Sequence, residues 1–287
     1  MKIVAGIVLY NPDIERLKEN ISACLPQVDE IILFDNGSEN IQIVKKLISS
    51  IKGNLDLLVS NENLGIAYAL NKIARRAINK KYKWLLTLDQ DSVIYPGLVK
   101  HYKENIDLQQ LGQLSCRRID RNIEEKDIIL NNCSVKEVKY CITSGTLISL
   151  QALKKINGFD QNLFIDWVDN EVCCALRKVG YKTYELDYKG LLQEMGHATC
   201  VNFLGKKIYT PNYTPIRYFY IARNSIYVAR KYPLEENRFK KFLQQIKLQI
   251  HILFFEKNKM KKIKAIKSGI YQGLTLNLTD NRGLYEE

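Results

Sequence analysis

Short apolar runs alternate with amphipathic segments through the first third of the chain. Aliphatic and β-branched runs at 3–10, 30–34, 55–60 and 84–88 are typical of strands buried on both faces. Between them, apolar residues recur every three or four positions, which predicts helices over about 14–25, 43–51 and 66–79. Successive strand–helix units predict an α/β fold, with a doubly wound, mostly parallel, Rossmann-like sheet flanked by helices.

The pattern changes in the rest of the chain. Residues 139–150 predict a strand interrupted at Thr143-Ser144-Gly145-Thr146, where the backbone can approach a ligand closely. A helix is predicted over about 168–179, and a loop rich in Tyr, Pro and Asn follows His197. Beyond Pro215 the pattern is helical to about Lys267. We therefore expect a main domain over residues 1–230 and a C-terminal helical extension over 231–287.

Composition is that of an ordinary globular protein, with 46% hydrophobic and 26% charged residues. No apolar run approaches the roughly 18–20 residues of a membrane-spanning helix. The first apolar run is also too short for a signal-peptide core.

The seven cysteines are odd in number and have no CxxC spacing, which predicts free thiols in a reducing compartment. A cytoplasmic location is expected.

Positive charge is concentrated near the C-terminus. The net charge is +12, and residues 238–267 hold ten basic residues and one acid. Apolar residues form one helical stripe there: Phe239, Phe242, Leu243, Ile246, Ile250 and Leu253. Such a basic amphipathic helix suits the anionic inner face of the cell membrane. Packing against the main domain, or against a second copy in a homodimer, explains the stripe equally well. No nucleic-acid-binding motif accompanies the charge, so no nucleic-acid partner is expected.

Polar residues gather where the predicted strands end, at Tyr10-Asn11, Asp35-Asn36, Asn61–Asn63 and Asp89–Asp91. Ligands of doubly wound sheets bind beyond the carboxyl ends of the strands, so one composite site is expected. The carboxylates of Asp89-Gln90-Asp91 suit a hard divalent cation, Mg²⁺ or Mn²⁺, that holds phosphate oxygens. Asp89-Gln90-Asp91-Ser92-Val93 also fits the nucleophile motif of haloacid-dehalogenase-type phosphatases, although that motif normally lies on the first strand of its domain.

Three acids, Asp166, Asp169 and Glu171, lie at the start of the predicted helix over 168–179. A carboxylate at this position caps the helix and is stabilised by its positive end. Alternatively, a carboxylate kept ionised there accepts a proton from an attacking hydroxyl group. The residues alone leave both interpretations open.

The ordered set of motifs resembles the inverting family 2 glycosyltransferases, which have the GT-A fold. The motifs that carry the resemblance are Val8–Asn11, Asp35–Ser38, Asn61–Ala67, Asp89–Asp91, Thr143–Thr146, Asn157–Asp160 and the acidic helix start that ends at Gly180-Tyr181. Within the family, Asp-Gln-Asp, residues 164–171, Gly196-His197 and residues 215–224 look most like the rhamnosyltransferase branch. The resemblance implies dTDP-β-L-rhamnose as the donor. The expected acceptor is a glycan or lipid-linked molecule of bacterial surface polysaccharide synthesis. A UDP-sugar donor (galactofuranosyl, glucosyl or N-acetylhexosaminyl) is the alternative with the same fold.

The resemblance also implies roles for individual residues. Counting back from Gly180 aligns Asp169 with the catalytic base, and Asp166 is a second candidate. Many family members carry Glu-Asp where this chain has Val168-Asp169. Asp91 is the implied metal ligand, and His197 is a further contact to the metal or the diphosphate. The implied donor contacts are Tyr10, Asn11, Asp35 (at the pyrimidine), Asn63, Gly65, Asp89, Gly145 and, at the diphosphate, Arg217 and Arg223.

Overall fold

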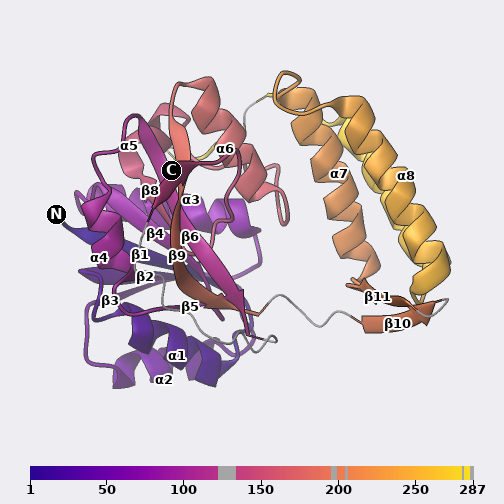
Figure 1. The fold of residues 1–287 in the computed structure, drawn as a ribbon. Coiled ribbons are helices and arrows are strands. Elements are labelled where there is room, and N and C mark those ends of the chain that lie inside the picture. The colour runs from indigo at the N-terminus through magenta and orange to yellow at the C-terminus, as the bar shows by residue number, and fades with distance from the viewer. Residues whose placement is uncertain (122–133, 195–198, 204–205, 280, 285–287) are drawn as a thin grey trace. The chain divides into compact units, whose positions relative to one another are not determined.

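The computed structural model of the chain describes residues 1–121, 134–194, 199–203, 206–279 and 281–284. The chain forms two compact units, which are drawn together in Figure 1. Unit 1 comprises Met1–Asn162, Val168–Met195 and Asn281–Glu287, and unit 2 comprises Leu163–Trp167 and Gly196–Asp280. This division does not by itself delimit a catalytic domain, and the predicted boundary after residue 230 stays a prediction.

Unit 1 is built on a mixed sheet with the order β3-β2-β1-β4-β8-β6-β9-β5, in which β7 also pairs with β9. The strands are β1 (Ile3–Leu9), β2 (Glu30–Asn36), β3 (Leu55–Ser60), β4 (Trp84–Asp89), β5 (Val93–Ile94), β6 (Leu111–Asp120), β7 (Val135–Glu137), β8 (Thr146–Ser149) and β9 (Lys182–Gln193). The strands predicted in the first third of the chain are all parallel. Strand β8 then runs antiparallel to both β4 and β6, while β6 and β9 are parallel. The predicted α/β fold is confirmed.

Helices cover both faces of this sheet. They are α1 (Ile14–Cys24), α2 (Ile41–Ser50), α3 (Ile66–Asn79), α4 (Leu98–Glu104), α5 (Leu150–Lys155) and α6 (Val168–Lys178). Ile3, Ala5 and Ile7 of β1 share one core with buried residues of α1, α2 and α4. Alternate residues of a strand face opposite sides, so Gly6 points to the other face. There a Cβ on Gly6 would lie 2.5 Å from the Ile73 side chain of α3, and the missing side chain therefore lets α3 pack closely.

Two segments differ from the sequence prediction. Of the strand predicted over 139–150, only β8 forms, and α5 begins at Leu150. Residues before β8 form a turn instead, in which the Gly145 amide donates to the Thr87 carbonyl oxygen at 2.8 Å. The segment predicted as a loop after His197 contains a hairpin of β10 (Thr199–Phe203) and β11 (Lys206–Thr210).

Unit 2 combines this hairpin with helices α7 (Pro215–Lys231), α8 (Arg238–Phe255) and α9 (Lys259–Thr275). The helical pattern predicted from 215 to 267 is therefore interrupted twice. Helix α9 packs closely on α7, because Gly269 and Gly273 face the carbonyl oxygens of Phe219 and Arg223, where a Cβ would lie at 2.3 and 2.5 Å. Within the described part of the chain, no helix is long and apolar enough to cross a membrane.

A buried carboxylate joins the elements of unit 2. The Lys262 ammonium donates to Glu256 at 2.8 Å, and the hydroxyls of Tyr218 and Thr210 donate to the other carboxylate oxygen. Burial alone would raise the pKa of Glu256, but these hydrogen bonds and the charge of Lys262 outweigh burial and lower it. Glu256 thus connects β11, α7 and α9 through charge-assisted hydrogen bonds.

The chain returns to unit 1 at residues 281–284. The Arg282 guanidinium donates to the Glu171 carboxylate of α6 and to the Gly158 carbonyl oxygen. The side chains of Arg282 and Glu171 are 4% and 1% exposed. The Asn157 side-chain amide also donates to the Arg282 carbonyl oxygen at 3.1 Å. This buried ion pair therefore fixes the returning segment against α6.

We expect Arg282→Met to lower the free energy of unfolding by about 3–5 kcal/mol, because it leaves the buried Glu171 charge without its guanidinium. Arg117→Met is the matched control: it breaks an ion pair with Asp187 of 2.8 Å whose side chains are 45% and 39% exposed. Exposed pairs contribute about 0–1 kcal/mol. Urea denaturation measures the free energy of unfolding of both variants. Equal losses of that free energy would contradict the assignment of Arg282 and Glu171 as a buried ion pair that stabilises the fold.

Candidate active site

The ends of the parallel strands converge as the sequence predicts. Strand β1 lies between β2 and β4, with Leu9 beside Asp35 and Val8 beside Asp89. The Tyr10 amide donates to the Gln90 side chain at 2.8 Å, and the Asn11 amide donates to the Ser38 hydroxyl at 2.8 Å. The loops after β1, β2 and β4 are therefore joined by hydrogen bonds at one edge of the sheet.

Asp35, near the end of β2, is 1% exposed. Its Oδ2 atom accepts a hydrogen bond from the Ser38 amide at 3.0 Å. Its Oδ1 atom is buried and has no hydrogen-bond partner among the described residues. Because a buried acceptor without a donor is costly, this oxygen is suited to accept an N–H group from a ligand.

The next residue, Asn36, organises the loop before α3, a role that is not predicted from the sequence. Its side-chain nitrogen donates to the Asn63 side chain at 2.9 Å, and its side-chain oxygen accepts from the Leu64 amide at 2.9 Å. Gly65 precedes α3 with φ of +88°, a conformation that favours glycine. Asn63 and Gly65 thus have well-defined positions at the N-terminus of α3.

Three neighbouring elements fix Asp89, the last residue of β4. Its Oδ2 atom accepts from the Gln193 amide at 2.7 Å, its backbone N–H donates to the Ser144 hydroxyl at 3.0 Å, and its carbonyl oxygen accepts from the Asn20 amide at 2.7 Å. Ser144 belongs to the turn with Gly145, whose φ is +74°. Gln193 ends β9, a strand that the sequence analysis did not predict, so this contact was missed.

Negative charge accumulates around Asp89. Although the residue is accessible, loss of solvent around its carboxylate raises its pKa to about 6, and the charges of Asp91 and Asp169 add to this. Loss of solvent also raises the pKa of Asp91, with a further contribution from Glu194. The guanidinium of Arg16, which pairs with Glu194 at 2.8 Å, opposes the rise at Asp91.

These carboxylates fit a divalent cation only in part. Among the described residues, no three or more His, Cys, Asp or Glu side chains are arranged to hold a metal ion. His197, the second predicted ligand, lies outside the described residues. However, Mg²⁺ commonly takes one or two protein carboxylates together with substrate phosphates and water. Asp89 and Asp91 match that donor set, because a cation would offset the like charges that raise the pKa of Asp89.

Asp169 lies in the first turn of α6, where its Oδ1 atom accepts from the Asn170 amide at 2.8 Å. Its charge contributes to the raised pKa of Asp89, so the two carboxylates belong to one electrostatic cluster of unit 1. The position of Asp169 at a helix start is compatible with both predicted roles, capping the helix and accepting a proton from a hydroxyl group.

Asp166, Arg217 and Arg223 belong to unit 2. Asp166 has φ of +62°, and it accepts from the Arg217 guanidinium at 3.3 Å. Burial raises the pKa of Asp166, and the charge of Arg217 opposes that rise. The Asn224 amide donates to the Asp166 carbonyl oxygen at 3.0 Å, and Arg223 donates to Asn224 at 2.8 Å. Within unit 2, therefore, the predicted residues form one hydrogen-bonded group, and their action on a diphosphate stays a prediction.

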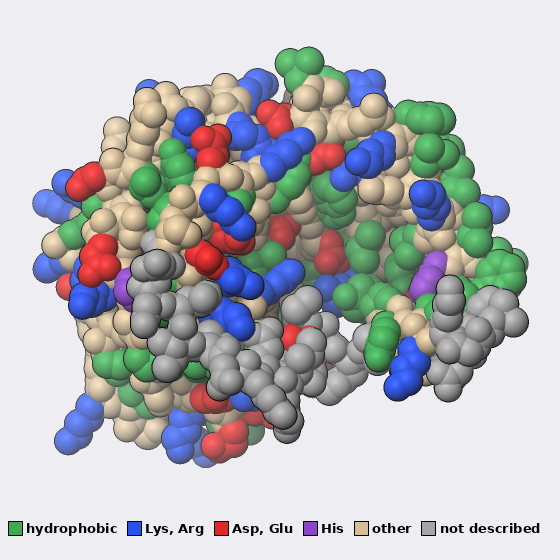
Figure 2. Space-filling model, viewed as in Figure 1, with side chains coloured by type: hydrophobic (Ala, Val, Ile, Leu, Met, Phe, Trp, Pro, Cys, Tyr) green, Lys and Arg blue, Asp and Glu red, His purple; other side chains and the backbone are tan. Residues whose placement is uncertain are grey.

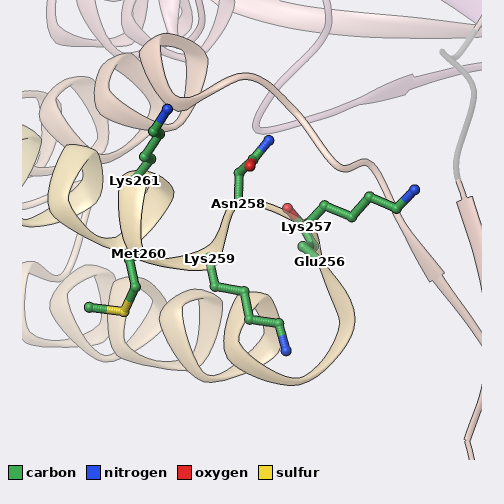
Figure 3. A pocket seen from close by; sticks show the side chains of 6 residues that line it. All are labelled: Glu256, Lys257, Asn258, Lys259, Met260 and Lys261. Atoms are coloured by element: carbon green, nitrogen blue, oxygen red, sulfur yellow. The ribbon is translucent and has the colours of Figure 1, made fainter.

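Two pockets in the described structure contain none of the predicted site residues. One, of about 590 Å³, lies between β3 and α3 and is lined by Val59, Tyr68 and Arg75 among others. The other, of about 620 Å³, lies at the turn between α8 and α9, where Lys257, Lys259 and Lys261 extend from the backbone (Figure 3). Neither pocket therefore marks the position of the predicted active site.

The model of a protein family described as glycosyl transferase family 2 matches residues 5–179, more than half of the chain. The chain belongs to this family. The match spans β1 to α6, and thus includes the converging strand ends and the Asp89–Asp91 triplet.

Known proteins agree with this assignment. The chain is 28% identical over 243 residues to the dTDP-rhamnosyl transferase RfbF of Shigella flexneri, covering 80% of each chain. Its fold is similar to that of S. aureus TarS, with a TM-score of 0.57, 16% identity and 90% of this chain covered. The chain spans 44% of the TarS chain. It is also similar to the mannosyltransferase PcManGT from Pyrobaculum calidifontis, in complex with GDP-Man and Mn²⁺, with a TM-score of 0.59, 12% identity, and 96% and 76% of the two chains covered. The GT-A fold and the glycosyltransferase class predicted from the sequence are confirmed.

Without divalent cations, we expect the Asp89 carboxyl to titrate near pH 6 in carbon NMR spectra, and Asp169→Asn to lower that midpoint by removing a neighbouring negative charge. Because the pKa rises from 3.8, the folded state binds more protons than the unfolded state between these values, so this group makes stability fall as pH rises toward 6.

Asp107→Asn, which changes an exposed acid before β6, is the control and should leave the Asp89 midpoint unchanged. An unchanged midpoint in Asp169→Asn as well would show that the two carboxylates do not interact.

Proposed function

We propose that this family 2 glycosyltransferase is an inverting, metal-dependent enzyme that transfers L-rhamnose from dTDP-β-L-rhamnose. The acceptor is a glycan or a lipid-linked molecule of bacterial surface polysaccharide synthesis. The cluster of Asp89 and Asp91, at and just after the end of β4, and Asp169, at the start of α6, carries the proposal for the chemistry. The similarity to the Shigella flexneri dTDP-rhamnosyl transferase supports the donor.

The nucleotide binds at the ends of β1 and β2. The free Oδ1 atom of Asp35 accepts the N–H group of the pyrimidine ring, and Tyr10 and Asn11 line the same pocket. Tyr10 is 48% exposed, so its ring is available to a base. Asn63 and Gly65 contact the donor from the N-terminus of α3, where the helix dipole favours an anionic group.

The diphosphate lies at the Asp89–Asp91 triplet, and Gly145 lets the backbone approach the donor. Asp91 would hold Mg²⁺ or Mn²⁺, with Asp89 directed to the ribose or the sugar, and the contact predicted from His197 lies outside the described residues. When bound, the cation supplies positive charge that stabilises the departing dTDP. Arg217 and Arg223 of unit 2 stay the predicted contacts of a diphosphate, because a guanidinium pairs well with phosphate.

Asp169 is the catalytic base. It removes the proton from the acceptor hydroxyl while the acceptor oxygen forms a bond to the anomeric carbon, and the bond from that carbon to the dTDP oxygen breaks on the opposite face. A single displacement inverts the anomeric centre, so the product is an α-L-rhamnoside. Asp166 is a weaker candidate because its carboxylate pairs with Arg217, whereas the charge of Asp169 acts directly on Asp89.

The hypotheses of a UDP-sugar donor and of a phosphatase differ in how well the observations support them. A UDP-sugar donor is compatible with the same residues, since Asp35 would accept from uracil as well as from thymine. The phosphatase hypothesis depended on the Asp89–Asp91 triplet alone, and the family assignment gives the triplet another explanation. We place the enzyme in the cytoplasm, at the inner face of the membrane if its acceptor is lipid-linked. Dimer formation stays a prediction.

Calorimetry with dTDP and UDP, with and without Mg²⁺, tests the donor site. We expect Mg²⁺-dependent binding of dTDP in preference to UDP, and Asp91→Ala should weaken it by about tenfold or more, because the cation would lose its carboxylate ligand. A preference for UDP would keep the enzyme class and reject the rhamnosyl donor. Absence of binding to either nucleotide would contradict the proposed site.

A second test separates the two candidate bases. Asp169→Asn should lower kcat by roughly 10²–10⁴-fold while dTDP binding is retained, because the change removes proton transfer but not the nucleotide pocket. Asp166→Asn is the comparison variant, and its loss should be smaller. If Asp166→Asn loses more activity at equal nucleotide binding, the base is Asp166.

A further inference from the structure

The apolar stripe predicted on the C-terminal helix is exposed in the structure. Six residues of α8 define this outer stripe: Phe239, Phe242, Leu243, Ile246, Ile250 and Leu253. Their exposed fractions range from 38% for Ile246 to 70% for Phe239. Figure 2 shows hydrophobic side chains gathered along α8. Single exposed apolar residues are common, but a continuous stripe on one helix marks an interaction surface.

The opposite side of α8 provides its packing within unit 2. Gln245 is 4% exposed and donates to the Ser225 hydroxyl of α7 at 3.0 Å. Ile252 is fully buried with Tyr218 of α7 and Ile266 of α9. Because these contacts already hold α8, the outer stripe is not needed for the packing of unit 2, and substitutions there should leave the fold intact.

The charge around the stripe has one sign. In residues 238–267 the one acid, Glu256, is buried against Lys262, whereas eight of the ten basic side chains are exposed. Lys240 and Lys247 lie on α8 next to the stripe, and Lys257 and Lys259 follow its C-terminal end (Figure 3). Within residues 238–267, therefore, the surface next to the stripe offers positive charge and no exposed carboxylate.

The exposed apolar stripe and the positive charge beside it together favour an anionic lipid surface over a second copy of the chain. In a symmetric dimer the same patch meets itself, which would bring two basic surfaces together. An anionic phospholipid surface instead accepts apolar side chains in its acyl region and lysines at its headgroups. We propose that α8 lies in the interface of an anionic bilayer, with the outer stripe inserted and Lys240 and Lys247 at the headgroups.

Vesicle co-sedimentation of the full chain without nucleotide sugar tests the proposal, so its outcome does not depend on the proposed donor. The protein should bind vesicles of phosphatidylcholine with phosphatidylglycerol more tightly than phosphatidylcholine alone, and salt should weaken that binding. Ile250→Ser should weaken it several-fold, because it removes inserted apolar surface. Lys240→Glu with Lys247→Glu should have a similar effect, since it reverses charges at the headgroups.

Matched controls lie in unit 1. Ile43→Ser on α2 changes an isoleucine that is 52% exposed, against 49% for Ile250, and Lys45→Glu with Lys46→Glu reverses two exposed lysines of the same helix. Both controls should bind vesicles as the parent protein does. Circular dichroism and donor hydrolysis in solution should be unchanged in the α8 variants, which separates a loss of attachment from a loss of folding or of the active site.

Two results would overturn the proposal. One is equal binding of Ile250→Ser and Ile43→Ser to the anionic vesicles. The other is a parent protein that is a dimer in sedimentation equilibrium and does not bind vesicles, while Ile250→Ser is a monomer. That result would make the outer stripe a self-association surface.

Discussion

The cost of keeping Asp89 charged at the end of β4 is the constraint around which the candidate active site of this glycosyltransferase is organised. Loss of solvent around its carboxylate is the largest cause that raises the pKa of Asp89 to about 6, and the charges of Asp91 and Asp169 add to it. The fold keeps the carboxylate in place through Gln193 of β9, Ser144 of the turn before β8 and Asn20 of α1. Elements from distant parts of the sequence thus hold a group of charges that would otherwise separate.

The structural carboxylates differ from those of the candidate site in whether a basic side chain balances their charge. Glu171 and Glu256 are buried, and each accepts from a basic side chain, Arg282 and Lys262 respectively. At Asp89, by contrast, loss of solvent and neighbouring charges of the same sign together raise the pKa to about 6. Sites that bind cations commonly accept such a cost in stability, because the ligand supplies the missing charge.

The sequence predicts best what is local. Strands β1 to β4 are continuous apolar runs, and their polar ends could be assigned to one edge because parallel strands must place them there. Gln193 was not predicted, because β9 mixes Tyr, Glu, Asp and Lys with apolar residues and has no clear period in the sequence. The role of Asn36 depends on a loop 27 residues away, which no local pattern encodes. Similarly, the spacing of the α8 stripe was visible in the sequence, but the side on which α8 is packed depends on Ser225 and Tyr218 of another helix.

The return of the chain to unit 1 has a consequence for protein synthesis. Glu171 of α6 is translated 111 residues before Arg282, its guanidinium partner. Until that residue leaves the ribosome, the nascent unit 1 must either keep Glu171 solvated or leave the region around α6 incompletely packed. All of α7, α8 and α9 emerges in the interval. Completion of the first unit therefore awaits residues that follow all the helices of unit 2, and contacts so distant in sequence form late and slowly.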